Sequence, residues 1–226
     1  MSLNLINGIF YYEHELKGID NETLISEIIR ARRDVELIHS GSGNSHIENQ
    51  SKPQGNQSRP IHTDVDVTHT FYEDVPLPVD IENQFKTATA SAIEGLFGEK
   101  SFEMNEVWGH YLPPLGQTMV HDHGAGREVR ISGVYYPHVP ENGGNLFFIC
   151  EINGSRCFYE LKIQPNYLYL FSSSLLHFTP RNGSGVDRVS VSANWNATPE
   201  FTEKINNDMT FDNVYWYFKG RSINVV

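Results

Sequence analysis

The sequence predicts a mainly β fold with flanking helices, arranged as a sandwich or barrel. After residue 100 the chain is a series of short segments rich in β-branched and aromatic residues, separated by turn sequences that contain Pro, Gly or Asn. Short strands at near-regular spacing are typical of sandwiches and barrels. We expect these strands at residues 102–111, 116–122, 129–138, 144–151, 156–163, 167–172 and 187–195.

The chain of 226 residues is short enough for one structural domain. Residues 101–226 hold the expected β core, and residues 1–100 supply a strand, two helices and a polar loop that pack on it. Hydrophobic residues make up 39% of the chain and aromatic residues 12%, which is enough apolar material for a packed core.

The N-terminal part begins with a predicted strand at residues 3–12 and continues with a helix. Asp20 or Asn21 can cap the start of this helix, and three arginines mark its expected end. Its apolar stripe follows a period of 3.6 residues. The stripe consists of Leu24, Ile25, Ile28 and Ile29, and the arginines are Arg30, Arg32 and Arg33.

Three further segments precede the β core. Residues 40–59 are rich in Ser, Gly, Asn and Gln and predict a long polar loop, and residues 61–72 alternate in polarity and predict a strand. Residues 79–97 predict a second helix, because Pro76 and Pro78 introduce it and a glycine follows it.

The net charge of −11 disfavours a nucleic-acid or anionic-membrane partner, since both need a face rich in Lys and Arg. No segment approaches the roughly 20 apolar residues of a membrane span, and no secretory signal is visible. Cys150 and Cys157 flank a predicted hairpin tip where a disulfide is geometrically feasible, but reduced thiols are the more common state in an unexported chain. We therefore expect a cytoplasmic protein.

Three histidines form a candidate metal site. His121 and His123 are two residues apart at the end of a predicted strand, so their side chains share a face while Asp122 points away. His177 follows the predicted strand 167–172. Three imidazoles are a suitable ligand set for iron, copper, nickel or zinc, and ligand type alone does not select the metal.

A candidate anion site follows eleven residues after His177. Arg188 and Ser190 lie on one face of the predicted strand 187–195, so a guanidinium and a hydroxyl can bind the same carboxylate. An anion site beside a metal site suits a dicarboxylate co-substrate that chelates the metal.

With these motifs in this order, the chain after residue 100 resembles the Fe(II)- and 2-oxoglutarate-dependent dioxygenases, close to their prolyl-hydroxylase-like branch. The motifs are His121-x-His123, Ser132-Gly-Val-Tyr-Tyr136, Gly143-Gly-Asn-Leu-Phe-Phe148, Leu168-x-x-Phe171-x-Ser173, His177, Arg188-x-Ser190 and Ser192-x-Asn194.

The resemblance implies a double-stranded β-helix, or jelly roll, of the cupin-like kind. It implies that His121, His123 and His177 hold Fe(II), that Arg188 and Ser190 bind the distal carboxylate of 2-oxoglutarate, and that a C–H bond is hydroxylated with release of succinate and CO2. Tyr136 is similar to a tyrosine that supports this carboxylate, and Tyr111 on the preceding strand is a further candidate for the same pocket.

The common pattern of the family is His-x-Asp, whereas this chain has His123 at the carboxylate position. A bulged strand would instead turn Asp122 inward and restore a carboxylate ligand. A rival set of His62, Asp64 and His121, with Arg130-Ile-Ser132 as the anion site, is disfavoured because it would place the helix 79–97 between the metal-binding strands.

Two other functions stay open. One is a non-catalytic jelly-roll protein that binds a metal or a ligand, and the other is a three-histidine, cupin-like metalloenzyme that does not use 2-oxoglutarate. The substrate, peptidyl or small-molecule, and the oligomeric state do not follow from the sequence.

Overall fold

The structure is a computed structural model that describes residues 2–6, 9–41, 74–123, 130–208 and 223–225. Its helices are α1 (Asn21–Gly41), α2 (Val79–Phe97) and α3 (Pro199–Asp208). Its strands are β1 (Ser2–Ile6), β2 (Ile9–Glu15), β3 (Asp74–Val75), β4 (Phe102–Leu112), β5 (Thr118–His121), β6 (Arg130–Tyr136), β7 (Leu146–Ile152), β8 (Ser155–Leu161), β9 (Tyr167–Ser172), β10 (His177–Thr179), β11 (Arg188–Ala197) and β12 (Ile223–Val225).

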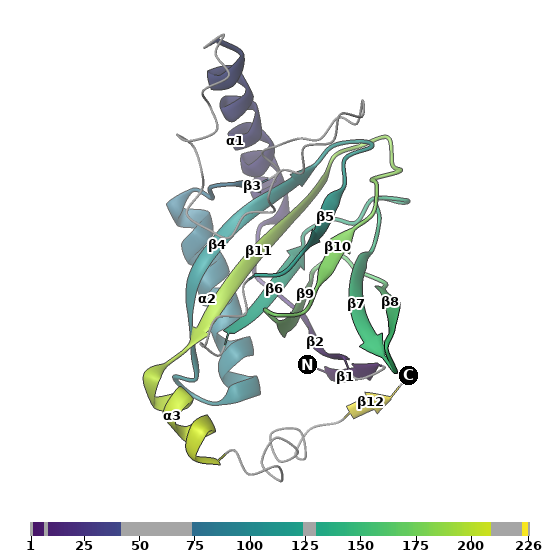
Figure 1. Ribbon diagram of the computed structural model, residues 1–226. Coiled ribbons are helices and arrows are strands. Elements are labelled where there is room, and N and C mark those ends of the chain that lie inside the picture. The colour runs from purple at the N-terminus through teal and green to yellow at the C-terminus, as the bar shows by residue number, and fades with distance from the viewer. Residues whose placement is uncertain (1, 7–8, 42–73, 124–129, 209–222, 226) are drawn as a thin grey trace.

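The strands form two sheets that face each other (Figure 1). The large sheet has the order β12-β1-β2-β9-β6-β11-β4-β3, and the small sheet has the order β5-β10-β7-β8. Apart from the parallel β1–β12 pair, the described pairings are antiparallel. Strands distant in sequence are neighbours, as β9–β6–β11 shows, which is the arrangement of a double-stranded β-helix. The predicted fold class is confirmed.

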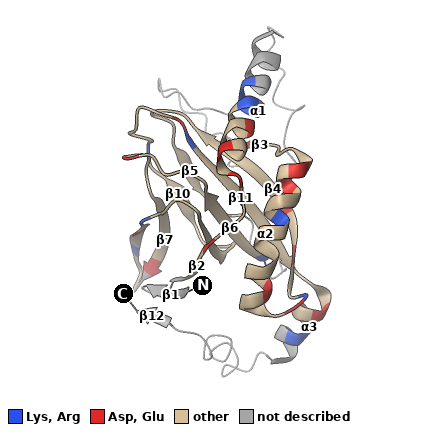
Figure 2. Cartoon of the chain, turned by 180° about the vertical axis from the view of Figure 1, so that it is seen from behind, with Lys and Arg blue, Asp and Glu red and all other residues tan. Residues whose placement is uncertain are grey.

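Helices α1 and α2 cover the outer face of the large sheet (Figures 1 and 2). Figure 2 shows charged residues along both helices, whereas the strands behind them are mostly uncharged. The buried side chains between helices and sheet form the larger apolar core, because alternate residues of each strand point to this side. Its members include Leu24, Ile28, Phe85, Ile93, Tyr135, Leu168, Leu170, Val191 and Trp195.

A second apolar core lies between the two sheets. It is built from the strand residues that alternate with the first set, so neighbours such as Tyr135 and Tyr136 belong to different cores. Its members include Tyr11, Val134, Tyr136, Leu146, Phe148, Tyr169 and Phe171. This inner face carries the residues of the candidate site.

Helix α2 agrees closely with the sequence pattern, whereas helix α1 extends beyond its predicted end. Helix α2 has the predicted bounds and ends at Gly98, whose positive φ of 101° suits glycine. Asp20 caps α1 by accepting hydrogen bonds from the backbone N–H and the hydroxyl of Thr23. Helix α1 continues past the arginines to Gly41, because the residues after Arg33 include good helix formers and no glycine or proline stops the helix earlier.

The predicted core strands are present with ends shifted by a few residues, but the opening strand was wrong in its extent. Residues 3–12 form parts of two antiparallel strands, β1 and β2, in which Leu3 pairs with Tyr12. The sequence did carry a signal for this hairpin, since Asn7-Gly8 is a common turn dipeptide.

Four short elements were missed: β3, β10, β12 and α3. Strands of two or three residues are too short for periodicity to reveal. The start of helix α3 does carry a sequence signal, a threonine followed by a proline. In the structure the Thr198 hydroxyl accepts a hydrogen bond from the N–H of Phe201, and Pro199 occupies the first turn.

The predicted strand 61–72, the rival ligands His62 and Asp64, and most of the polar loop 40–59 lie outside the described residues. The described helices include none that is long and apolar enough to cross a membrane. Cys150 and Cys157 are direct cross-strand partners on β7 and β8, and both are free thiols.

Candidate metal and anion site

The structure brings the three predicted histidines together. His121 ends β5 and His177 begins β10, and the two are direct partners across the antiparallel pair. His123 lies two residues beyond the end of β5. One ligand nitrogen from each imidazole can be chosen so that all three lie within 4.8 Å of one another. Strand pairing thus places two of the imidazoles, and the i, i+2 spacing brings the third to them.

The spacing and orientation of the rings suit a metal ion. Nε2 of His123 and Nε2 of His177 are 3.2 Å apart. Two nitrogens that each bind one metal at about 2.0–2.1 Å are separated by about 2.8–3.4 Å in octahedral or tetrahedral geometry. Nδ1–H of His121 donates to the carbonyl of Met119 (2.7 Å), and Nδ1–H of His177 donates to that of Leu175 (2.8 Å). These bonds leave Nε2 of both rings as the lone-pair nitrogen.

Burial keeps the three imidazoles neutral. Removal from water lowers the pKa of His123 to about 3, with smaller contributions from His121 and the Arg130 guanidinium. Burial also lowers the pKa of His121, and it lowers that of His177 well below the usual value. A neutral imidazole is the form that binds a metal, so these pKa shifts prepare the cluster for a cation at neutral pH.

Asp122, the alternative third ligand, is exposed, whereas His123 is buried. The side chain of Asp122 is not one of the clustered ligand groups. This follows the alternation expected at the end of a strand, in which only one of two successive residues faces inward.

The predicted anion-binding residues lie on the large sheet, opposite the histidines. Arg188 and Ser190 on β11 and Tyr136 on β6 are each at most 2% exposed. The guanidinium carbon of Arg188 lies 4.9 Å from the centre of the Tyr136 ring, a cation–π distance. Burial raises the pKa of Tyr136 although Arg188 partly opposes this shift, so the phenol keeps its O–H donor at neutral pH.

The histidines and the anion-binding residues line one cavity. Along the inner face of β11, Arg188, Ser190 and Ser192 follow one another, and Ser192 pairs with Trp108 on β4. The Trp108 ring lies 5.6 Å from the ring of His123. The cavity therefore has a neutral imidazole cluster from one sheet, its histidine end, and a buried guanidinium from the other sheet, its arginine end.

Tyr111 does not line this cavity, which corrects its assignment to the pocket. It belongs to the helix-covered side of the large sheet, where the guanidinium carbon of Arg32 lies 5.9 Å from its ring centre. The physical reason is strand alternation, because Tyr111 follows His110 on β4 and His110 faces the cavity.

His110 and Asp74 are site residues that the sequence did not reveal. Nδ1–H of His110 donates to Oδ1 of Asp74 on β3 (2.8 Å), and Nε2 of His110 lies 2.9 Å from the hydroxyl oxygen of Thr118 on β5. All three residues line the cavity, and the His110–Thr118 contact joins the large sheet to the small sheet. His110 is recognised as a site residue only from its pairing with Ser190 across β4 and β11, and that pairing is set by the tertiary fold.

No family model and no curated protein matches the sequence. Solved structures do match the fold. The non-heme monooxygenase ThoJ in its nickel complex has a TM-score of 0.54 and 8% sequence identity, covering 84% of this chain and 75% of that chain. The non-heme alpha-ketoglutarate (2-oxoglutarate)-dependent epimerase SnoN from nogalamycin biosynthesis has a TM-score of 0.50 and 12% identity, covering 82% and 76%. A prolyl-4-hydroxylase from Pseudomonas putida has a TM-score of 0.46 and 16% identity, covering 83% and 86%.

This chain spans about half the length of two other matched chains. It covers 56% of a 2OG-Fe(II) oxygenase family oxidoreductase from Burkholderia pseudomallei and 47% of EvdMO1. The chain therefore shares the fold of a non-heme monooxygenase and of a non-heme alpha-ketoglutarate-dependent epimerase, at a distant level of sequence similarity.

Proposed function

We propose that this protein is an Fe(II)- and 2-oxoglutarate-dependent dioxygenase that hydroxylates a peptidyl or small-molecule substrate and releases succinate and CO2. The observation that carries the proposal is the single cavity that joins three neutral imidazoles to a buried guanidinium. A dicarboxylate that also chelates a metal is a ligand that needs both ends of this cavity.

In this proposal His121, His123 and His177 hold the metal through one nitrogen each. The metal, when bound, supplies the activation of O2 that protein side chains cannot provide. Because its ligands are three neutral imidazoles, the site carries one positive charge more than a site with a carboxylate ligand. The exposure of Asp122 and the burial of His123 support this ligand set.

The chain's own groups would orient the co-substrate. Arg188 supplies a guanidinium that can bind a carboxylate through two parallel N–H bonds, and the hydroxyls of Ser190 and Tyr136 supply further donors. The apolar walls, which include Val134, Leu146 and Phe171, exclude water from this pair of charges and strengthen their attraction.

The test is an anaerobic titration of the metal-free protein with Fe(II) and then 2-oxoglutarate, following the visible charge-transfer band of the chelate. The wild-type chain should give the band only when both are present. The variant His177→Ala should give no band, and Arg188→Met should need far more 2-oxoglutarate. His138→Ala and Arg181→Met change exposed residues of the same types and serve as matched controls.

The titration also separates the alternatives. Iron binding without a band at any 2-oxoglutarate concentration would contradict the dioxygenase proposal and favour a three-histidine metalloenzyme of another kind. Absence of iron binding would favour a non-catalytic jelly-roll protein. If the band appears, the next step is to identify the substrate. Succinate release would then be measured in the presence of candidate peptides and metabolites.

A further inference from the structure

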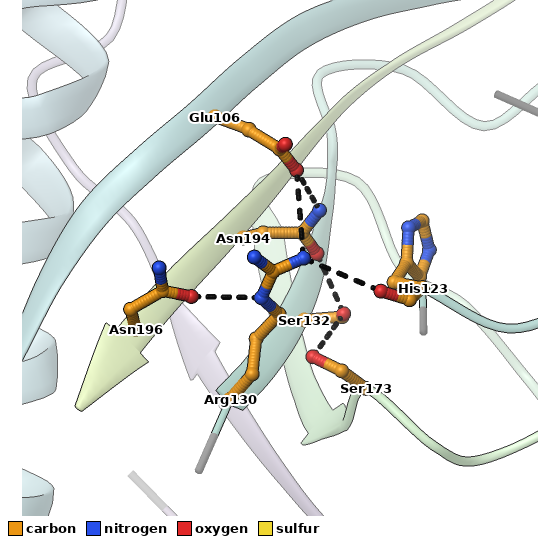
Figure 3. A network of polar contacts seen from close by, with 7 residues as sticks. All are labelled: Glu106, His123, Arg130, Ser132, Ser173, Asn194 and Asn196. Carbon is orange, nitrogen blue, oxygen red and sulfur yellow. Dashed lines mark hydrogen bonds and ion pairs between the residues drawn. The ribbon is translucent and has the colours of Figure 1, made fainter. Parts of the chain in front are cut away.

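His123 occupies an unusual position among the three histidines. His121 and His177 belong to paired strands, whereas His123 lies beyond the last residue of β5. Its backbone is held from two sides instead. Its N–H donates to the carbonyl of Ser173 (2.9 Å), and Nη1–H of Arg130 donates to its carbonyl (3.3 Å). Both backbone partners of His123 are themselves part of a larger polar network (Figure 3).

One arm of the network runs from Ser173 to Glu106. The Ser132 hydroxyl donates to Oδ1 of Asn194 (2.7 Å), so the Ser173 hydroxyl, 2.7 Å from it, is the donor to Ser132. Nδ2 of Asn194 donates to Oε2 of Glu106 (2.6 Å). The direction of the hydrogen bonds is thus determined along the arm, and the amide of Asn194 has one orientation that satisfies both of its neighbours.

The other arm runs from Glu106 to Arg130. Oε2 of Glu106 lies 4.0 Å from Nη1 of Arg130, and Nε–H of Arg130 donates to Oδ1 of Asn196 (2.7 Å). The N–H of Ser173 also donates to the carbonyl of Arg130 (3.3 Å), which joins the two arms behind His123. Figure 3 shows Glu106 above Asn194 and Arg130, with His123 to the right of both.

We propose that the network of Glu106, Asn194, Ser132, Ser173 and Arg130 positions His123 as the third metal ligand, with Glu106 as its anchor. These are positioning residues, because none of them is among the clustered metal-binding groups. The inference rests on the proposed metal site, and it adds a determinant of that site in strands β4, β6 and β11.

The burial of the network supports a positioning role. Ser132, Ser173 and Asn194 are at most 2% exposed, where apolar side chains would be cheaper to bury. A buried polar chain whose members are all paired is rigid and has a unique geometry. His123 lies beyond the last residue of β5, so the network supplies the backbone contacts that fix it. Changes to groups that orient metal ligands weaken metal binding by about 10- to 100-fold.

The experiment measures Co(II) binding to the metal-free full chain by calorimetry, together with the visible absorption of the bound ion. Asn194→Asp replaces the N–H donor with a carboxylate beside Glu106 at nearly unchanged size. We expect its dissociation constant for Co(II) to rise about 10- to 100-fold, with an altered absorption spectrum. Glu103→Gln, at an exposed position on β4, the strand of Glu106, is the control and should leave both unchanged.

A double variant provides the decisive comparison. In Glu106→Gln with Asn194→Asp, the introduced amide can donate to the introduced carboxylate, so the hydrogen bond between the two positions is restored with its direction reversed. We expect it to recover most of the Co(II) affinity and the wild-type spectrum. A thermal melt of each variant identifies loss of folding. If Asn194→Asp does not fold, Glu106→Met, which keeps the side-chain length and removes the oxygen that accepts from Asn194, replaces it as the weakened variant.

The outcomes separate the two proposals. Unchanged Co(II) affinity in folded Asn194→Asp, or a double variant as weak as the single one, would overturn the positioning role alone. A wild-type chain that binds no Co(II) would remove the proposed metal site and the positioning role with it.

Discussion

The two ends of the cavity are built from different sheets and offer opposite chemistry. The histidine end belongs to the small sheet and its continuation, where His121, His123 and His177 present lone pairs. The arginine end belongs to the large sheet, where Arg188, Ser190 and Tyr136 present hydrogen-bond donors.

Because the two ends differ in chemistry, a substitution at one end should weaken its own ligand without weakening the ligand of the other end. One end suits a cation and the other suits an anion, and among the described residues the three histidines and the three donors are separate sets. A ligand that chelates a metal and carries a second carboxylate would be held by both sheets at once. Variants at each end should therefore separate metal binding from co-substrate binding.

The largest effect is expected from His177→Ala. Loss of one of three imidazoles should weaken Fe(II) or Co(II) binding by more than the roughly 100-fold upper limit seen for changes to groups around metal ligands. Calorimetry measures this, with His138→Ala as the control. An unchanged metal affinity would exclude His177 as a ligand.

Arg188→Met should leave metal binding intact and weaken 2-oxoglutarate binding. Removing one partner of a buried charge pair costs about 2–5 kcal/mol, or roughly 30- to several-thousand-fold in affinity. The measurement is a 2-oxoglutarate titration of the iron-loaded protein. If metal affinity fell in parallel, the two ends would not be independent.

Tyr136→Phe and Tyr111→Phe compare the two faces of the large sheet. Removal of the Tyr136 hydroxyl should weaken 2-oxoglutarate binding by about 1.5–3 kcal/mol, the value of a hydrogen bond to a charged group. Tyr111→Phe should have no effect, because this ring lies on the helix-covered face. Equal effects in the two variants would contradict the assignment of the faces.

pH should act on the stability of the histidine end. The pKa of His123 is about 3 in the folded chain and near 6.5 when unfolded, so below pH 6.5 the unfolded chain binds more protons and the metal-free protein loses stability. The contribution of neutral His123 to the free energy of unfolding is fully present above pH 6.5 and is lost as the pH falls towards 3. At pH 5.5 the loss amounts to about 1.4 kcal/mol.

Chemical unfolding of the metal-free protein at pH 8 and at pH 5.5 measures this loss. His123→Ala should show a pH dependence smaller by about this amount, while His138→Ala keeps that of the wild type. An identical pH dependence in His123→Ala would mean that the buried imidazole is not responsible.

Much of this architecture could be predicted because local patterns carry it. The bounds of α2 follow from prolines before it and a glycine after it, and the core strands follow from period-two alternation between turn sequences. The i, i+2 spacing of His121 and His123 and of Arg188 and Ser190 is also local, and the structure turns each pair to one face.

Other features depended on contacts between segments distant in the chain. Strand alternation predicts that His110 and Tyr111 face opposite sides of the sheet. Only the packing of α1 and α2 decides which side is the outer one, and Tyr111 was assigned to the wrong side. Asp74 meets His110 across 36 residues of sequence, and Asn194 meets Glu106 across 88.

By itself, then, the sequence determined helix α2, the longer core strands, the fold class and the residue types of the two ends, since these depend on periodicity, caps and turns within short segments. The tertiary structure decided which face of each strand is inner, which hydrogen-bonded residues lie around the histidines, and how His123 is held beyond the end of its strand. The physical reason is that strand pairing brings together side chains whose separation along the chain carries no local pattern.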